Sequence, residues 1–243
     1  MQKEEVMYEN YVFDLYGTLL DIRTNENNAY LWKKLSEIYR AYGADYTAGE
    51  LKRTFRLLEQ EIVRILPENG EPDLNQVFDR LFHCKGVECD SRLITHVAIT
   101  FRSLSRKKLC VYEGVYEALQ RLKDKGKGIY LLSNAQRDFT RPELTMTGLA
   151  DYFDGILISS EVGYKKPAPE FFDQLFRTFG LKPEECLMIG NDEYSDIEGA
   201  IRAGMDSLYI HTAISPELEG ESKADYAVMD GDWSKVAALL ERL

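Results

Sequence analysis

Residues 12–20 read VFDLYGTLL, and this stretch decides the fold. An apolar run from Tyr11 to Leu15 contains one acid, Asp14, and the turn Tyr16–Thr18 follows at once. Because the run is hydrophobic on both faces, it predicts a short strand at the centre of a parallel sheet covered by helices. Asp14 then lies where this strand ends.

The composition limits the classes of protein to which the chain can belong. Its 243 residues suit one large domain or a core with an inserted second domain, and 44% hydrophobic and 29% charged residues are typical of a soluble globular protein. A net charge of −11 argues against nucleic acid or an anionic membrane as a partner. No apolar run approaches the ~20 residues of a membrane span. The N-terminal stretch MQKEEVMYEN lacks the apolar segment of a secretion signal, so we expect a cytoplasmic protein.

Beyond Asp21 the hydrophobic pattern becomes helical. Residues 22–106 contain apolar residues at helical spacing and predict a bundle of about four helices without strands. Thr24 or Asn25 is a suitable N-cap for the first helix. The stripes are Leu31-Leu35-Ile38-Tyr42, Leu51-Phe55-Leu58-Ile62-Ile65, Leu74-Val77-Phe78-Leu81 and Leu93-Val97-Phe101-Leu104.

From Lys108 onward, helices and strands alternate, which predicts an α/β fold with a doubly wound parallel sheet. The first strand belongs to this sheet, so the helical bundle is an insertion. We expect residues 1–20 and 107–243 to form the core and residues 21–106 the inserted domain, with hinges near 17–23 and 105–114. The expected strands are 128–132, 155–159, 186–189, 207–210 and 226–228, and the expected helices are 114–125, 139–146, 169–179 and 195–203.

Polar residues collect where the predicted strands end, and the carboxyl edge of an open parallel sheet is where ligands bind. One acid after a strand is usually an ordinary solvated strand end. Several such ends with complementary chemistry indicate a site. They are Asp14 with Thr18, Ser133 with Asn134, Lys165 with Lys166, and Asn191 with Asp192 and Asp196.

These residue types suit chemistry on an anionic group. A carboxylate can act as a nucleophile. Hydroxyls and backbone N–H groups at Thr18 and at Ser133-Asn134 can bind anionic oxygens, and a lysine can balance the charge of a transferring phosphoryl group. Several carboxylates near one anion need a hard cation, for which Mg²⁺ is suited.

The sequence resembles the haloacid dehalogenase-like hydrolase superfamily. Its DxDGT motif appears as Asp14-Leu15-Tyr16-Gly17-Thr18, its apolar strand ending in Ser or Thr as YLLSN, its Lys-Pro motif as GYKKPAPEFF, and its acidic loop opening a helix as IGNDEYSDIEGA. The motifs occur in the family's order, and the helical insertion after the first matches the family's cap domain.

The resemblance implies a role for each matching residue. Asp14 would be the nucleophile, and the main-chain carbonyl of Tyr16 would bind Mg²⁺. Thr18 and Ser133, together with Asn134, would bind phosphoryl oxygens, and Lys166 would anchor Asp14 and the substrate.

The fourth loop leaves the side-chain ligand of Mg²⁺ open between Asn191, which stands where the family usually has an acid, and Asp192 beside it. We favour Asp192, because a carboxylate offsets divalent charge. Asp196 would orient a metal-bound water or Lys166. Helix capping is the structural alternative for both acids.

Tyr16 departs from the phosphatase pattern, which usually has a second aspartate there as acid and base. A phenol with a pKa near ~10 is a poor substitute. L-2-haloacid dehalogenases carry D-x-Y-G-T and need no proton for a departing halide. Their fourth motif is less acidic and metal-free, however, and no arginine among Arg23, Arg40, Arg53 and Arg56 matches their carboxylate-binding arginine.

We therefore predict a Mg²⁺-dependent phosphatase of a small phosphomonoester, acting through an aspartyl-phosphate. A metal-free dehalogenase and a non-catalytic regulatory protein are the alternatives. Arg23 and Glu26 are the nearest candidates to supply the missing proton transfer. We expect a monomer or homodimer; Tyr30, Tyr39 and Tyr42 belong to the core of the insertion or to an interface.

Overall fold

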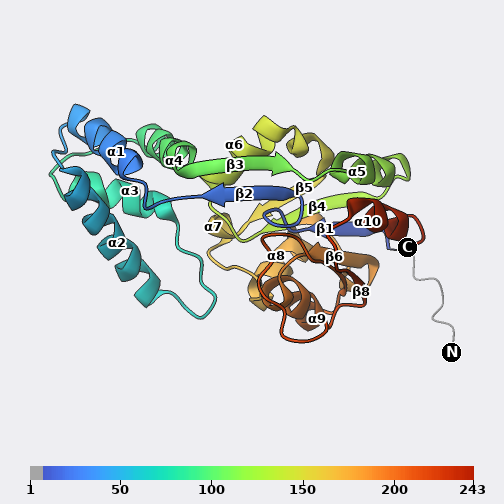
Figure 1. Ribbon diagram of the computed structural model, residues 1–243. Coiled ribbons are helices and arrows are strands. Elements are labelled where there is room, and N and C mark those ends of the chain that lie inside the picture. Colours follow the sequence, from blue (N-terminus) through green and yellow to red (C-terminus); the bar gives the residue numbers. More distant parts are fainter. Residues whose placement is uncertain (1–7) are drawn as a thin grey trace.

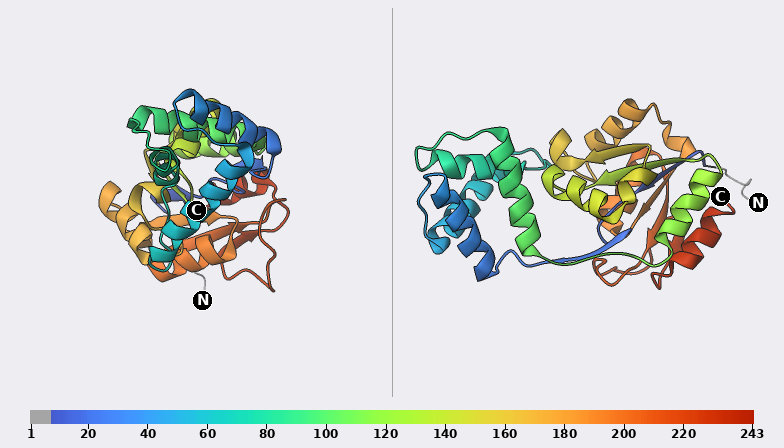
Figure 2. Two further views of the ribbon diagram at one scale, coloured as in Figure 1. Left: turned by 90° about the vertical axis from the view of Figure 1, so that its left-hand side faces the viewer. Right: turned by 90° about the horizontal axis from the view of Figure 1, so that it is seen from above.

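A computed structural model of the protein describes residues 8–243 (Figure 1). An α/β body contains the sheet, and a cluster of helices lies beyond one end of it (Figure 2). Residues 1–7, which we assigned to the core and to the polar N-terminus, lie outside the described residues. Within residues 8–243, no helix is both long and apolar enough to cross a membrane.

The body is built on a six-stranded parallel sheet in the order β5-β4-β1-β6-β7-β8. Strand β1 (Asn10–Phe13) lies inside the sheet, where Val12 pairs with Tyr130 on one side and Met188 on the other. The predicted α/β class and parallel sheet are confirmed. The other strands are β4 (Gly128–Ser133), β5 (Gly155–Ile158), β6 (Cys186–Gly190), β7 (Asp206–Ile210) and β8 (Tyr226–Val228).

Helices cover both faces of the sheet, because alternate residues of its central strands are apolar in both directions. Phe13 packs in a core with helices α5 and α10, whereas Val12 packs on the opposite face with α8. Helix α10 was not expected; it begins after the N-cap Asp232, whose side chain accepts from the backbone N–H of Ser234. The predicted helix at 195–203 begins earlier, with the π-helical turn η3 (Glu193–Ile197) before α9. Bounds are α5 (Val115–Asp124), α6 (Arg137–Thr147), η1 (Leu149–Tyr152), α7 (Ser159–Val162), α8 (Pro169–Phe179), η2 (Pro183–Glu185), α9 (Glu198–Ala203) and α10 (Trp233–Leu240).

The inserted helices, called the cap below, are α1 (Ala29–Ala41), α2 (Ala48–Ile65), α3 (Leu74–His83) and α4 (Ser91–Ser105). They enclose an aromatic core in which Phe55 stacks on Phe101, with ring centroids 5.4 Å apart. The N-cap of α1 is Asn28, so the expectation of Thr24 or Asn25 was wrong; these residues belong to the connection before the helix.

The three cap tyrosines divide between the two places that we considered. Tyr39 is fully buried, and its hydroxyl donates to the carbonyl of Phe78. Tyr30 and Tyr42 are 56% and 55% exposed. Of Tyr30, Tyr39 and Tyr42, only Tyr39 therefore belongs to the core of the cap.

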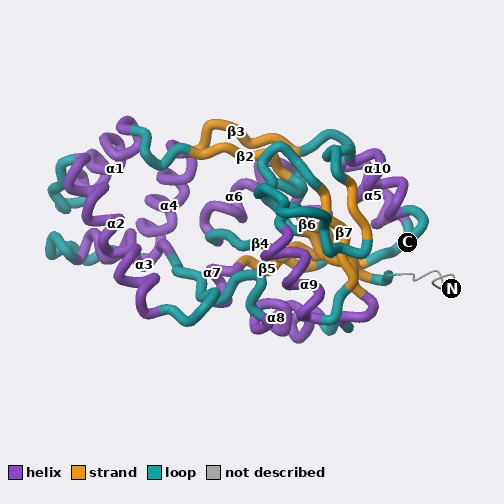
Figure 3. Tube along the Cα trace, turned by 60° about the horizontal axis from the view of Figure 1, so that its bottom comes forward, coloured by secondary structure: helices purple, strands orange, loops and turns teal. Residues whose placement is uncertain are grey.

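The cap and the body are joined by an antiparallel ribbon of two strands, β2 (Leu20–Thr24) and β3 (Arg106–Val111). We expected hinges here and no strand within 22–106; the expectation of no strand was wrong, because β2 and β3 include residues 22–24 and 106. The two connections run side by side, so their backbone N–H and C=O groups pair with each other. Figure 3 shows the ribbon extending from the body to the cap, and both predicted domain boundaries fall within it.

Candidate active site

Asp14 follows β1 at the carboxyl edge of the sheet, and its carboxylate is held on both oxygens. Oδ1 accepts from Lys166 Nζ at 2.8 Å, and Oδ2 accepts from Thr18 Oγ1 at 3.0 Å. Its backbone N–H donates to the carbonyl of Ile189 in the neighbouring strand β6, which continues the sheet by one residue. Asp14 is only 7% exposed, so the carboxylate is fixed and shielded from bulk water.

Lys166 lies between two carboxylates. Its Nζ is 2.8 Å from Asp14 Oδ1 and 2.7 Å from Asp196 Oδ1, and it also donates to the carbonyl of Leu132. The lysine is 2% exposed. Burial alone would lower its pKa, but the two carboxylates outweigh burial and raise the pKa above the ordinary value. Lys166 is therefore a buried cation at neutral pH.

Ser133 ends β4, and its hydroxyl is the polar atom most in need of a ligand. The side chain is fully buried, and Oγ has no hydrogen-bond partner among residues 8–243. A buried hydroxyl without a hydrogen bond lowers the stability of the folded protein, so a ligand oxygen that accepted from Ser133 Oγ would remove this cost.

Asn134 differs from Ser133, because both ends of its amide are already bonded. Oδ1 accepts from the backbone N–H of Lys166 at 2.7 Å, and Nδ2 donates to the carbonyl of Lys166 at 3.0 Å. This two-point pairing positions the backbone of Lys166. Ligand binding by the Asn134 side chain, which the resemblance implied, would require breaking it.

The fourth loop brings Asn191 and Asp196 toward Asp14. The Oδ2 atom of Asp196 accepts from the backbone N–H groups of Asn191 and Asp192, each at 3.0 Å. Asn191 Oδ1 lies 3.1 Å from Thr18 Oγ1, the hydroxyl that also donates to Asp14. The Asp192 carboxylate instead accepts from the backbone N–H groups of Tyr194 and Ser195 and caps the following helical turn.

The donors that converge here fit Mg²⁺ without forming a cage of charged ligands. Among the described residues, no three His, Cys, Asp or Glu side chains come together as a metal site. Mg²⁺ typically takes one or two carboxylates and keeps several waters. Asp14 and Asn191 each place a side-chain oxygen within hydrogen-bond distance of the Thr18 hydroxyl. A Cβ on Gly17 would lie 2.4 Å from the Asn191 amide, so the turn after Asp14 and the fourth loop are in close contact.

The phenol of Tyr16 is engaged in a network that the sequence did not reveal. Its hydroxyl donates to Glu143 Oε2 at 2.6 Å and lies 3.1 Å from Thr140 Oγ1. Glu143, on α6, is fully buried and also accepts from Arg102 of α4 at 2.8 Å and Arg106 of β3 at 3.0 Å. Burial and the Glu143 charge raise the pKa of Tyr16. These residues are far apart in sequence, and no motif links them.

A cavity of about 290 Å³ lies between the cap and the body and includes Tyr16 and Asn134. Of the two residues that we considered for proton transfer, Glu26 lines it and Arg23 does not. Glu26 forms an ion pair with Arg56 at 3.1 Å. The other lining residues are Glu59, Glu71, Pro72, Leu74, Arg102, Ala135, Gln136, Phe139 and Thr140.

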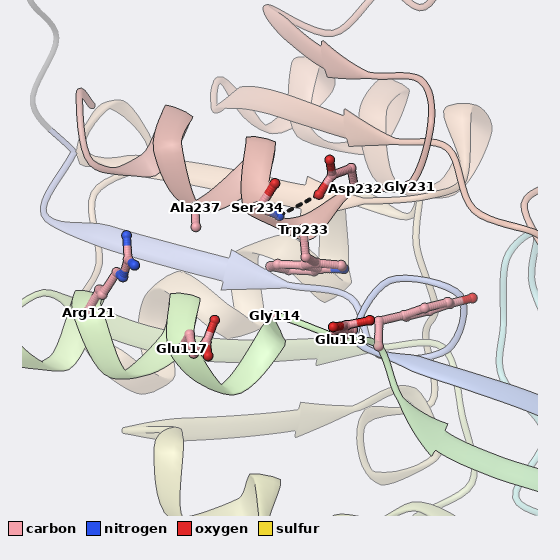
Figure 4. A pocket seen from close by; sticks show the side chains of 10 residues that line it. Glu113, Gly114, Glu117, Arg121, Gly231, Asp232, Trp233, Ser234 and Ala237 are labelled. Atoms are coloured by element: carbon pink, nitrogen blue, oxygen red, sulfur yellow. Dashed lines mark hydrogen bonds between the residues drawn. The ribbon is translucent and has the colours of Figure 1, made fainter.

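A larger cavity of about 610 Å³ lies between α5 and α10 (Figure 4). None of the predicted site residues lines it. Its floor is nevertheless linked to the site, because Trp233 Nε1 donates to the main-chain carbonyl of Thr18 at 3.2 Å. Helix α10 therefore supports the turn that follows Asp14.

A comparison with protein families agrees with this geometry, since the model of the haloacid dehalogenase-like hydrolases matches residues 8–204. The chain belongs to the haloacid dehalogenase-like hydrolase family. This confirms the resemblance and the prediction of a haloacid dehalogenase-like hydrolase.

Relatives of this hydrolase carry names of phosphatases. The chain is 27% identical over 221 residues to a glyceraldehyde 3-phosphate phosphatase from Pyrococcus furiosus, covering 90% of this chain and 88% of the relative. It is 34% identical over 125 residues to a phosphoserine phosphatase from Thermus thermophilus, covering 51% and 50%. It is 28% identical over 229 residues to the pyrophosphatase PpaX from Bacillus cereus, covering 94% and 93%.

Solved structures share the fold of this hydrolase. A 2-haloacid dehalogenase from Pseudomonas syringae superposes with a TM-score of 0.69 at 22% identity, covering 97% of this chain and 99% of that one. The magnesium-bound hydrolase YfnB from Bacillus subtilis gives 0.58 at 19% identity, with the same coverage. At such identities the likeness shows the fold alone.

Proposed function

We propose that this hydrolase is a Mg²⁺-dependent phosphatase that acts on a small phosphorylated metabolite through Asp14. The observation that carries the proposal is the buried Asp14 carboxylate, held by Lys166 and Thr18 at the sheet edge where the neighbouring strand β4 ends in the unpaired hydroxyl of Ser133. The names of the relatives support a phosphoryl substrate over a halogenated one.

In the proposed reaction, Asp14 attacks phosphorus in line, the bond from phosphorus to the alcohol oxygen breaks, and an aspartyl-phosphate forms. Lys166 balances the charge on the transferring group, the hydroxyl of Ser133 donates to its oxygens, and the hydroxyl of Thr18 holds the Asp14 carboxylate in place. Water then attacks the same phosphorus, which releases phosphate and restores the Asp14 carboxylate. Asp196 holds Lys166 and the fourth loop in place.

We propose Asp14, Asn191 and the main-chain carbonyl of Tyr16 as the ligands of Mg²⁺. When bound, the ion supplies electrostatic stabilisation of the phosphoryl oxygens. We prefer Asn191 to Asp192 because its side-chain oxygen lies beside Thr18, whereas the Asp192 carboxylate is engaged in helix capping.

We further propose that residues 21–106 act as the cap over this site and select the substrate. The cavity between cap and body is small, which supports a metabolite as the leaving group. The relatives suggest substrates to test: glyceraldehyde 3-phosphate, phosphoserine and pyrophosphate.

Dehalogenation is the second candidate, favoured by the position of Tyr16 after Asp14. The only arginine lining the cavity among the described residues, Arg102, makes two hydrogen bonds to Glu143 and so is already engaged. A halogenated acid would therefore have to compete with Glu143 for it.

The deciding experiment measures phosphate release from these three substrates and chloride release from 2-chloropropionate, each with and without Mg²⁺. Phosphate release that requires Mg²⁺ and disappears in Asp14→Asn supports the proposal. Metal-independent chloride release would replace it with dehalogenation. Full phosphatase activity in Asp14→Asn would exclude the covalent mechanism.

A further inference from the structure

Cleavage of an alkyl phosphate leaves an alkoxide, which needs a proton, and the described site has no obvious donor. The phenol of Tyr16 is bonded to Glu143, and its pKa is raised. Three cap carboxyls line the cavity beside Tyr16: Glu26, Glu59 and Glu71. Two of them, Glu26 and Glu59, are already engaged, because each forms an ion pair with Arg56.

Glu71 differs because its segment is docked directly on the body. Its backbone N–H donates to the carbonyl of Gly163 at 2.9 Å, and the backbone N–H of Lys165 donates to the carbonyl of Asn69 at 3.0 Å. Gly70 and Tyr164 form a β-bridge between these two contacts. The segment from the cap therefore pairs with the chain just before Lys166, and the position of Glu71 is fixed relative to the catalytic loop.

The side chain of Glu71 is also held in place. Its Oε1 accepts from Gln136 Nε2 at 2.9 Å, and the same amide of Gln136 donates to the carbonyl of Pro72 while its oxygen accepts from the N–H of Leu74. Gln136 belongs to the loop that follows Ser133 and Asn134. Gln136, a residue of the body, thus holds both the Glu71 carboxyl and the backbone of Pro72 and Leu74.

The charge around Glu71 allows it to hold a proton. Among residues 8–243 it forms no ion pair; Lys165 of the docked loop is the charged group that acts on it, and Glu26, Glu59 and Arg102 line the same cavity. Burial raises the pKa of the Glu71 carboxyl above its usual range, and Lys165 with the hydrogen bonds from Ser159 and Gln136 opposes this only in part. A carboxyl with a raised pKa suits both proton donation and proton acceptance near neutral pH.

We propose that Glu71 is the catalytic acid and base of the reaction, supplied from the cap in place of the group that Tyr16 lacks. This inference rests on the proposed phosphatase function. In the first step, the Glu71 proton goes to the ester oxygen as that oxygen leaves phosphorus and Asp14 bonds to it. In the second, the Glu71 carboxylate takes a proton from the attacking water as the bond between phosphorus and Asp14 breaks, which restores both side chains.

The test uses two phosphate esters whose leaving groups differ in their need for a proton. p-Nitrophenolate leaves phosphorus without protonation, whereas the alkoxide of glyceraldehyde 3-phosphate does not. In Glu71→Gln with Mg²⁺, p-nitrophenyl phosphate should give a rapid burst of about one nitrophenolate per enzyme. Steady turnover should then be slowed by about 10²-fold, because aspartyl-phosphate accumulates without its base. The alkyl phosphate should show no burst and a similar loss of turnover.

Two further variants keep the test specific. Glu68→Gln, an exposed change on the same cap segment, should behave like the wild type. Glu71→Asp keeps a carboxyl group and should recover part of the turnover. Such recovery would show that the loss in Glu71→Gln comes from the missing carboxyl and not from a folding defect.

Three results would overturn the inference. Unchanged turnover in Glu71→Gln would exclude Glu71 as the acid and base but leave the proposed phosphatase function intact. An equal loss of the burst and of steady turnover would do the same, because it indicates a structural role for Glu71. If the wild type releases phosphate from neither ester, the proposed function itself fails, and Glu71 with it. The wild-type rate therefore distinguishes the two failures.

Discussion

Replacing Tyr16 with phenylalanine tests whether the phenol is structural or catalytic. The change removes one hydrogen bond to the buried carboxylate of Glu143 and leaves the main-chain carbonyl of residue 16 unaltered. A hydrogen bond to a charged group contributes about 1.5–3 kcal/mol. We expect a loss near the lower end, about 1.5–2 kcal/mol, because Glu143 keeps the hydrogen bonds from Arg102 and Arg106.

The loss can be measured by urea denaturation and by thermal melting. At about 2–4 °C per kcal/mol for a protein of this size, the melting temperature should fall by about 3–8 °C. Phosphatase turnover should stay within about threefold of the wild type, since the phenol donates to Glu143 and not to the substrate. Tyr42→Phe, which alters an exposed ring of the cap, provides the control and should change neither quantity.

A hundredfold loss of turnover in a fully folded Tyr16→Phe variant would refute this reasoning. It would mean that the phenol leaves Glu143 during the reaction and acts on the substrate. An unchanged melting temperature would refute the other half, namely that the hydrogen bond to Glu143 stabilises the folded protein.

The remaining predictions concern Glu143, Gly17, the metal and Glu71. Glu143→Gln should lower the free energy of unfolding in urea by about 3–5 kcal/mol, because it leaves two half-buried arginines without their buried carboxylate; a loss below about 1 kcal/mol would contradict it. Gly17→Ala should destabilise the protein and weaken Mg²⁺ binding in calorimetry, because Gly17 has φ +93° and the new Cβ would displace Asn191; an unchanged affinity would count against Asn191 as a ligand. Chelation of Mg²⁺ should abolish phosphate release, and added Mg²⁺ should restore it; activity that persists in chelator would exclude the metal. Because burial raises the folded pKa of Glu71, its contribution to stability should be complete below the unfolded pKa of about 4.3 and disappear as pH rises through the folded value. Urea curves of the wild type and Glu71→Gln between pH 4 and pH 8 would show this as a growing disadvantage of the wild type, whereas a constant difference would exclude it.

The arrangement of the site residues at one sheet edge was predictable because parallel strands end together. Asp14, Ser133 and Lys166 are far apart in sequence, yet the sheet order brings the segments that carry them to the same edge. The choice between Asn191 and Asp192 was not predictable, because adjacent side chains point in directions set by the backbone after Gly190. At that glycine a Cβ would collide with Asp196, a contact that only the folded loop reveals.

Contacts between the two parts of the molecule were the least predictable. Glu143 lies 127 residues from Tyr16 and 41 residues from Arg102, and its burial depends on how α4 packs against α6. Glu71 belongs to no sequence motif, and its place at the cavity depends on the pairing of its segment with the chain before Lys166. The ribbon was not predicted because β3 reads RKKLCV, a strand with three charged residues that pairs with β2 outside the main sheet.

The ribbon has a consequence for the evolution and engineering of such enzymes. Both strands that carry the chain to and from the cap run antiparallel, with Leu20 paired to Val111 and Arg23 to Lys108. A foreign domain whose ends lie one strand spacing apart can therefore be spliced in between them, while Asp14 and Lys166 stay in place. The ribbon is thus an attachment point at which the inserted helices can be exchanged while the residues of the proposed site stay in the body.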